Sequence, residues 1–214
     1  MSSPSRFSAA RRIGGAVLRS VRTLVCAGAL LLCAGDGPAF AHGGPPLRLG
    51  VTTDPAVSAV ARLVLVHLRE GVGFAVDWRE FPDEAALRAA FAAGRIDIAV
   101  GVTDPGSLPA TVPSATDCPG ASLTALSDGL RRRWGGEVFL LGFPSGPSAC
   151  VRPALIVARA VLEDLRFGIL GKESGRMAVF ITRDDVAAVR AAAERDERSA
   201  IVAARVVLAA KTKR

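Results

Sequence analysis

Short apolar runs alternate with segments of helical hydrophobic spacing in the first half of the chain, and this rhythm limits the possible folds most strongly. Apolar or alternating runs cover 47–51, 74–79 and 96–100. Between them, apolar residues recur three or four positions apart over 57–68 and 87–91. An order of strand, helix, strand, helix, strand predicts parallel strands joined by right-handed crossovers. We therefore predict an α/β protein whose parallel sheet carries helices on both faces.

The second half continues this pattern with longer interruptions. Strands are predicted at 138–141 and 154–157, and helices at 123–134, from 158 to about 165, at 182–189 and at 200–210. Thr182 and Asp185 have the spacing of a capping box, which marks a helix start. The segments 101–120 and 142–150 are rich in Pro, Gly, Ser and Thr and lack periodicity, so they are predicted to be loops.

Residues 1–41 are predicted to be a cleavable secretory signal. Five arginines and no acidic residue precede position 36, and an apolar run covers 23–35. This run is shorter than the ~20 residues that span a membrane, and Ala39-Phe40-Ala41 has the small-x-small pattern of a cleavage site before His42. A retained membrane anchor is the alternative, which the short run disfavours. We expect a periplasmic or secreted protein.

Removal of this signal changes the charge balance. The whole chain has 27 basic and 20 acidic residues, whereas 42–214 has 22 and 19. So small an excess does not favour a nucleic-acid partner. The remaining length is that of one domain with its own core.

The chemistry-bearing residues outside the signal are few. Cys118 and Cys150 lie in Pro/Gly-rich loops, and in an oxidising compartment such a pair predicts a disulfide. The two histidines, His42 and His67, have no ligand-spaced partners, so neither a metal nor a cofactor is expected. The chain has no nucleophile elbow, phosphate-binding loop or dinucleotide fingerprint, and we predict that it is not an enzyme.

Two similar loops follow the first and third predicted strands. Their sequences are GVTTDP at 50–55 and GVTDP at 101–105. The carboxyl ends of parallel strands face one crevice, where such folds bind ligands. The predicted ligand-binding residues in these loops are Thr52, Thr53, Asp54, Thr103 and Asp104. The alternative is that both are ordinary turn and cap sequences, which use the same residue types.

Aromatic side chains are candidates for contact with a cationic ligand. Trp134 and Phe143 lie near predicted loops, whereas Trp78 and Phe139 lie in predicted strands and are expected in the core. We therefore add Trp134 and Phe143 to the predicted ligand-binding residues, with packing as the alternative role of both.

Several segments resemble a known family. LRLGV (47–51), FAVDWREF (74–81) and LRAAFAAGRIDIAV (87–100) resemble the opening of periplasmic substrate-binding proteins of ABC importers, notably the glycine betaine/choline type. PALIVARAVLEDLRFGILGK (153–172) resembles the segment with which that family's chain re-enters its first lobe, and RMAVFITRDDVAAVRAAA (176–193) resembles the helical region that follows.

The resemblance implies a type II periplasmic-binding-protein-like lobe over 42–214. It divides the lobe into a first βαβαβ segment (42–102), a linker or reduced second lobe (103–152) and a return segment (153–214). It also implies an exported protein that reversibly binds a small polar or quaternary-ammonium solute and has a membrane ABC permease as partner. The other hypothesis is a degenerate accessory or interaction domain of the cell envelope that binds no ligand.

Overall fold

The computed structural model describes residues 45–102, 120–142 and 152–212. All of them belong to one compact unit, 40–214. The predicted signal and five of the predicted functional residues lie outside the described ranges; the five are Thr103, Asp104, Cys118, Phe143 and Cys150. No helix in the described ranges has the length and hydrophobicity that crossing a membrane requires.

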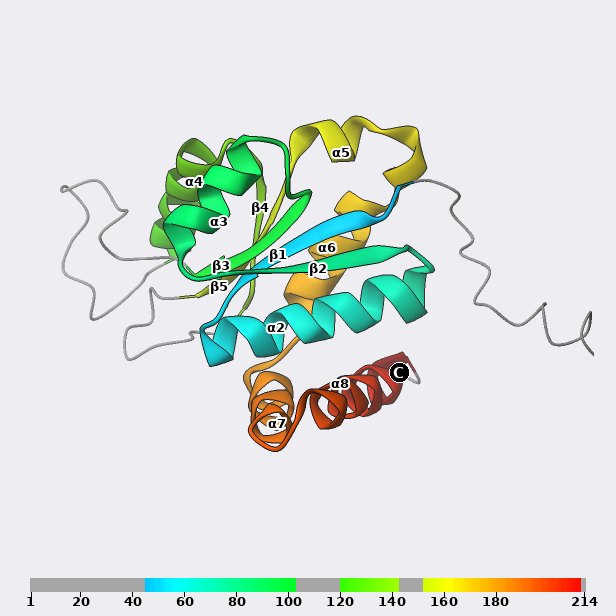
Figure 1. Cartoon of the computed structure of the whole chain (residues 1–214). Helices are drawn as coiled ribbons and strands as arrows, with labels where there is room; N and C mark the ends of the chain where they lie inside the picture. Colours follow the sequence, from blue (N-terminus) through cyan, green and yellow to red (C-terminus); the bar gives the residue numbers. More distant parts are fainter. Residues whose placement is uncertain (1–44, 103–119, 143–151, 213–214) are drawn as a thin grey trace, which may run out of the picture. The chain divides into compact units, whose positions relative to one another are not determined.

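Five strands form one mixed sheet (Figure 1). They are β1 (Leu47–Thr52), β2 (Val76–Phe81), β3 (Ile98–Val102), β4 (Glu137–Leu140) and β5 (Pro153–Val157), in the order β2-β1-β3-β5-β4. β1 runs parallel to β2 and β3, whereas β5 runs antiparallel to β3 and β4. The predicted parallel sheet is thus correct for β1 to β3 and wrong for β5.

The direction of β5 follows from its connection. β4 precedes β5 in the chain and lies beside it, and only 141–152 separate the two strands. A parallel neighbour needs a crossover of about a dozen residues or more, usually containing a helix. The connection from β4 to β5 is at the lower limit of length for such a crossover. An antiparallel pair needs no crossover, and β4 and β5 pair antiparallel.

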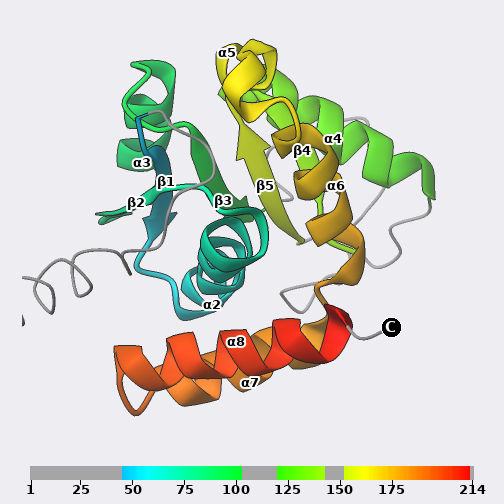
Figure 2. The ribbon, with the colours of Figure 1, turned by 90° about the vertical axis from the view of Figure 1, so that its right-hand side faces the viewer.

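Helices cover both faces of the sheet, as predicted. α3 (Glu84–Ala92) and α4 (Gly120–Trp134) lie on one face (Figure 1). The other face carries α2 (Pro55–Val66), which continues into the π-helical turn η1 (His67–Val72), and α6 (Leu170–Phe180). Two more helices, α7 (Arg183–Ala193) and α8 (Glu197–Thr212), pack on the outer side of α2. Figure 2 shows α7 and α8 side by side beneath α2. Helix α5 (Arg159–Glu163) and the 3-10 turn η3 (Leu165–Phe167) connect β5 to α6.

β5 is the strand that both layers of the core share. Its five residues are all buried. Leu155 and Val157 pack into the cluster beneath α2 and α6, whereas Ala154 and Ile156 pack into the cluster beneath α3 and α4. Successive side chains of a strand point to opposite faces, so this short apolar run fills both layers.

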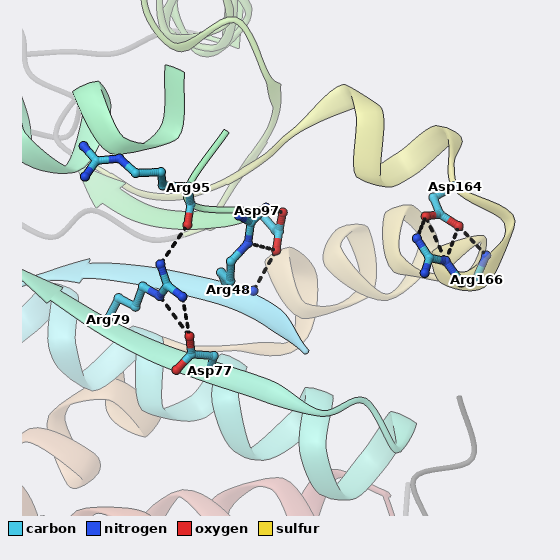
Figure 3. Close-up of polar contacts among 7 residues, drawn as sticks. All are labelled: Arg48, Asp77, Arg79, Arg95, Asp97, Asp164 and Arg166. Carbon is cyan, nitrogen blue, oxygen red and sulfur yellow. Dashed lines mark hydrogen bonds and ion pairs between the residues drawn. The ribbon is translucent and has the colours of Figure 1, made fainter. Parts of the chain in front are cut away.

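The amino ends of β1 and β3 are joined by a bidentate ion pair. Nε and Nη2 of Arg48 donate to the Asp97 carboxylate at 2.8 and 2.6 Å, and the backbone N–H of Arg48 donates to the same group at 2.8 Å (Figure 3). The hydrogen bond to Asp97 raises the pKa of Arg48. Both charges are thus satisfied within the sheet, and this edge is structural.

The predicted capping box at the start of α7 is present and holds the end of α8. Asp185 accepts from the N–H and the hydroxyl of Thr182, both at 2.7 Å. Lys211 of α8 lies 2.7 Å from the same carboxylate and donates to the carbonyl of Phe180. Burial acts to raise the pKa of Asp185, but the hydrogen bonds from Lys211 and Thr182 outweigh it and hold that pKa below its usual 3.8.

This arrangement predicts a stability difference that depends on pH. A carboxyl group with a lowered pKa stabilises the folded protein above its unfolded value and loses that contribution as pH falls through the folded one. Asp185→Asn should therefore unfold at lower urea concentration than the wild type at neutral pH, and the difference should shrink once pH falls below about 3.8. A difference that stays constant into strong acid would contradict the ionised role.

Candidate functional site

The strand order reverses at β1, and a cavity opens beside that point. From β1 the chain goes to β2 on one side and then to β3 on the other. In open α/β sheets, ligands bind outside the carboxyl ends of the strands at such a switch point. A cavity of about 370 Å³ lies there, lined by Thr52, Thr53, Asp54, Val57, Pro82, Asp83, Glu84, Gly101 and Val102.

Three predicted site residues, Thr52, Thr53 and Asp54, come together in this cavity. Gly101 and Val102, with which the second predicted loop begins, line the same cavity. The starts of both loops therefore meet at one edge of the sheet. Thr103 and Asp104 follow Val102 directly but lie outside the described residues, so their contact with a ligand stays a prediction.

Carboxylates cap both helices that begin at the cavity. Asp54 caps α2 by accepting from the N–H groups of Ala56 and Val57, each at 2.9 Å. Asp83 caps α3 by accepting from the N–H of Ala86 at 2.7 Å. A helix start with free N–H groups attracts anions. Here Asp54 and Asp83 already accept from N–H groups at the starts of α2 and α3. The cavity therefore presents the negative charge of these carboxylates rather than free N–H donors.

This negative charge is only partly balanced. Among the cavity carboxylates, Glu84 lies 2.8 Å from a guanidinium nitrogen of Arg133 on α4. Within the described ranges, Asp54 and Asp83 have no ion-pair partner. Threonine hydroxyls and two unpaired carboxylates suit an organic cation that also accepts or donates hydrogen bonds. The described part of the chain holds no group of three or more His, Cys, Asp and Glu side chains placed for a metal ion.

Trp134 belongs to the core cluster beneath α3 and α4. Its side chain is 4% exposed and packs edge-on against Phe91, with ring centroids 5.6 Å apart. A Cβ on Gly101 would lie 3.7 Å from Cζ2 of Trp134, so the indole packs near Gly101, which lines the cavity. Trp134 is not among the lining residues, and Phe143 lies outside the described ranges.

Sequence reasoning missed the third wall of the cavity. In the sequence, Pro82, Asp83 and Glu84 indicate only the start of a helix, because early acidic residues complement the helix dipole. They do start α3, and Asp83 caps it. However, they also follow β2 at the same edge as the other two loops. Their position after a parallel strand was the signal that could have identified them.

A larger cavity of about 760 Å³ lies between η1, α6 and α8. Its polar side chains are engaged in hydrogen bonds and ion pairs that join η1, α6 and α8 to one another and α8 to α7. His67 lies 2.9 Å from Glu173, Glu70 lies 2.7 Å from Arg205, and Lys211 serves Asp185. These pairs account for the polar side chains structurally, so we assign the site to the carboxyl ends of the strands.

The cavity at the carboxyl ends of β1 and β3 is therefore the candidate site. It combines two hydroxyls, unpaired carboxylates and the switch-point position. Comparisons with protein-family models, curated proteins and solved structures give no match, so its ligand is inferred from its own side chains.

Proposed function

We propose that the protein is an exported solute-binding protein of an ABC-type importer that reversibly binds a small polar or quaternary-ammonium solute. The observation that carries this proposal is the cavity at the switch point, with Thr52, Thr53, Asp54 and Asp83 in its walls. Its net negative charge favours the cationic members of that solute class.

The proposed fold is a type II periplasmic-binding-protein-like lobe. The segments LRLGV, FAVDWREF and LRAAFAAGRIDIAV, which carry the family resemblance, contribute to β1, β2, α3 and β3. PALIV, which resembles the family's return segment, is β5 and enters the sheet between β3 and β4. These positions support a single lobe whose site faces the carboxyl ends of the strands. The proposed location is the periplasm or the medium, and the proposed partner is a membrane permease.

The proposal is tested by binding measurements on the purified protein. A thermal-shift screen should include choline, glycine betaine, amino acids and inorganic anions. A bound solute at a hundredfold excess over its Kd stabilises the folded state by about 2.7 kcal/mol. We expect cationic solutes to raise the Tm and inorganic anions to leave it unchanged.

Two substitutions separate charge from stability. Asp54→Asn and Asp83→Asn remove charge while keeping a side chain that caps a helix about as well as aspartate. Each should weaken choline binding about fivefold or more, measured by calorimetry, because an ionic contact is replaced by a weaker dipolar one. Asp196→Asn is the matched control, since Asp196 accepts from the N–H of Ser199 at the start of α8, away from the cavity.

The accessory-domain hypothesis predicts a different result. Exposed apolar side chains support it, since Leu165 and Val179 are 96% and 83% exposed. Such side chains occur singly on many surfaces and also at protein interfaces. If no solute in the screen shifts the Tm, this hypothesis replaces the solute-binding one.

A further inference from the structure

A second cavity adjoins the candidate site and carries the opposite charge. Its volume is about 450 Å³, and it lies between the start of α2, the ends of β3 and β5, and α7. Val57 and Val102 line both cavities. Asp54 lines only the first and Ala56 only the second, so the first turn of α2 stands between them.

Two arginines of α7 line the second cavity. Arg183 is exposed at the helix start and has no ion-pair partner in the described part of the chain. Arg190 follows seven residues later on the same face, and its Nε lies 3.8 Å from Glu194, a carboxylate that lines the same cavity. An ion pair of that length between exposed side chains contributes little stabilisation, so it does not hold Arg190 firmly. The lining therefore keeps a net positive charge and guanidinium donors that suit a carboxylate.

The two cavities on either side of the first turn of α2 thus carry charges of opposite sign. Asp54 and Asp83 lie on one side, and Arg183 and Arg190 lie on the other. The N–H groups of Ala56 and Val57 serve Asp54, so the helix start itself offers no anion site between them. A solute that meets both charged walls therefore needs charges separated by a chain of several atoms.

We infer that the site takes an extended dipolar solute, with an ammonium group in the carboxylate-lined cavity and a carboxylate against Arg183 and Arg190. This inference rests on the proposed solute-binding function and narrows its substrate class. It also separates the preferred solute from compact betaines, whose carboxylate lies too near the ammonium group to reach α7.

A matched set of solutes tests the inference on the purified protein by calorimetry. The set contains the trimethylammonio derivative of hexanoic acid, hexyltrimethylammonium without the carboxylate, hexanoate without the cation, and glycine betaine as the compact zwitterion. We expect the extended zwitterion to bind about tenfold more tightly than hexyltrimethylammonium, because it gains one charge-assisted contact. Hexanoate alone should bind weakly.

The double substitution Arg183→Gln with Arg190→Gln should remove that tenfold advantage and leave hexyltrimethylammonium and glycine betaine unchanged. Arg195→Gln is the matched control, because Arg195 is exposed beyond the end of α7 and does not line either cavity. Both arginines are exposed, so the folded state should survive the substitution, which the Tm checks.

The outcomes separate the two proposals. If neither hexyltrimethylammonium nor choline binds, the cation site fails, and this inference fails with it. If both cations bind but the added carboxylate gives no gain, or the gain persists in the double variant, the dipolar solute is wrong while the cation site stands.

Discussion

Replacing Asp97 with alanine is expected to lower the free energy of unfolding by about 3 kcal/mol, because it leaves Arg48 without its partner at the amino edge of the sheet. The Asp97 side chain is 11% exposed, against 34% for Arg48. It accepts three hydrogen bonds from Arg48, one of them from the backbone N–H. Removing one member of this partly buried pair costs more than the pair contributes, since the donors of Arg48 lose their acceptor.

Figure 3 contains the control for this substitution. Asp77 and Arg79 form a second pair on β2, in which both side chains are more than 40% exposed. Exposed pairs contribute between zero and about 1 kcal/mol. Asp77→Ala should therefore change the urea midpoint only slightly. Equal losses in Asp97→Ala and Asp77→Ala would show that the amino-edge pair has no special structural role.

Replacing Gly136 with alanine is expected to cost about 2–3 kcal/mol through overpacking. A Cβ at this position would lie 2.8 Å from the backbone carbonyl oxygen of Val157 and 2.9 Å from Cζ of Phe91. The carbonyl belongs to β5, which is hydrogen-bonded to strands on both sides. A shift of this strand would therefore disturb hydrogen bonds to both neighbours. The strand must shift, or Phe91 must leave its position against Trp134.

Gly142→Ala is the control for this second substitution. A Cβ at Gly142 would meet no atom within 4 Å, and its φ is not positive. The free energy of unfolding of the Gly142→Ala variant should stay within about 0.5 kcal/mol of the wild-type value. A loss at Gly136 no larger than that at Gly142 would contradict the close packing of Gly136 against β5 and Phe91.

Local patterns predicted the elements of the first half because each is encoded within a few residues. Asp54 and Asp83 mark the starts of α2 and α3, and Gly94, with φ of 66°, follows the end of α3. The third strand was predicted at 96–100 but begins two residues later, at Ile98. Ile96 and Asp97 are buried, yet the Asp97 side chain is bound to Arg48, and β1 pairs with β3 only from Ile98 onward.

Local patterns failed where tertiary contacts decide the structure. No separate helix was predicted over Leu170–Phe180, because Gly171, Ser174 and Gly175 weaken the helical signal. Burial of Leu170 and Met177 against the sheet stabilises α6 nonetheless. In the same way, an apolar run predicts a buried strand but not its direction, so β5 was expected to run parallel.

The candidate site was predictable to the extent that strand ends define it. Thr52, Thr53 and Asp54 follow β1, and a parallel sheet brings them beside the end of β3. Asp83 and Glu84 after β2 were not predicted as site residues, because acidic residues at a helix start are explained by capping and the helix dipole alone. The arginines of α7 could not be placed at this edge from sequence, because only the packing of α7 against α2 brings them there.

The most direct test of the solute-binding account is an NMR titration of the purified, isotope-labelled protein with choline. The account predicts saturable amide shifts that cluster at Thr53, Asp83 and Gly101, which line the cavity at the carboxyl ends of β1 and β3. It also predicts that Asp83→Asn weakens the titration while Asp196→Asn does not. Shifts that cluster instead around His67 and Glu173, or no saturable shift with any cationic solute, would contradict it.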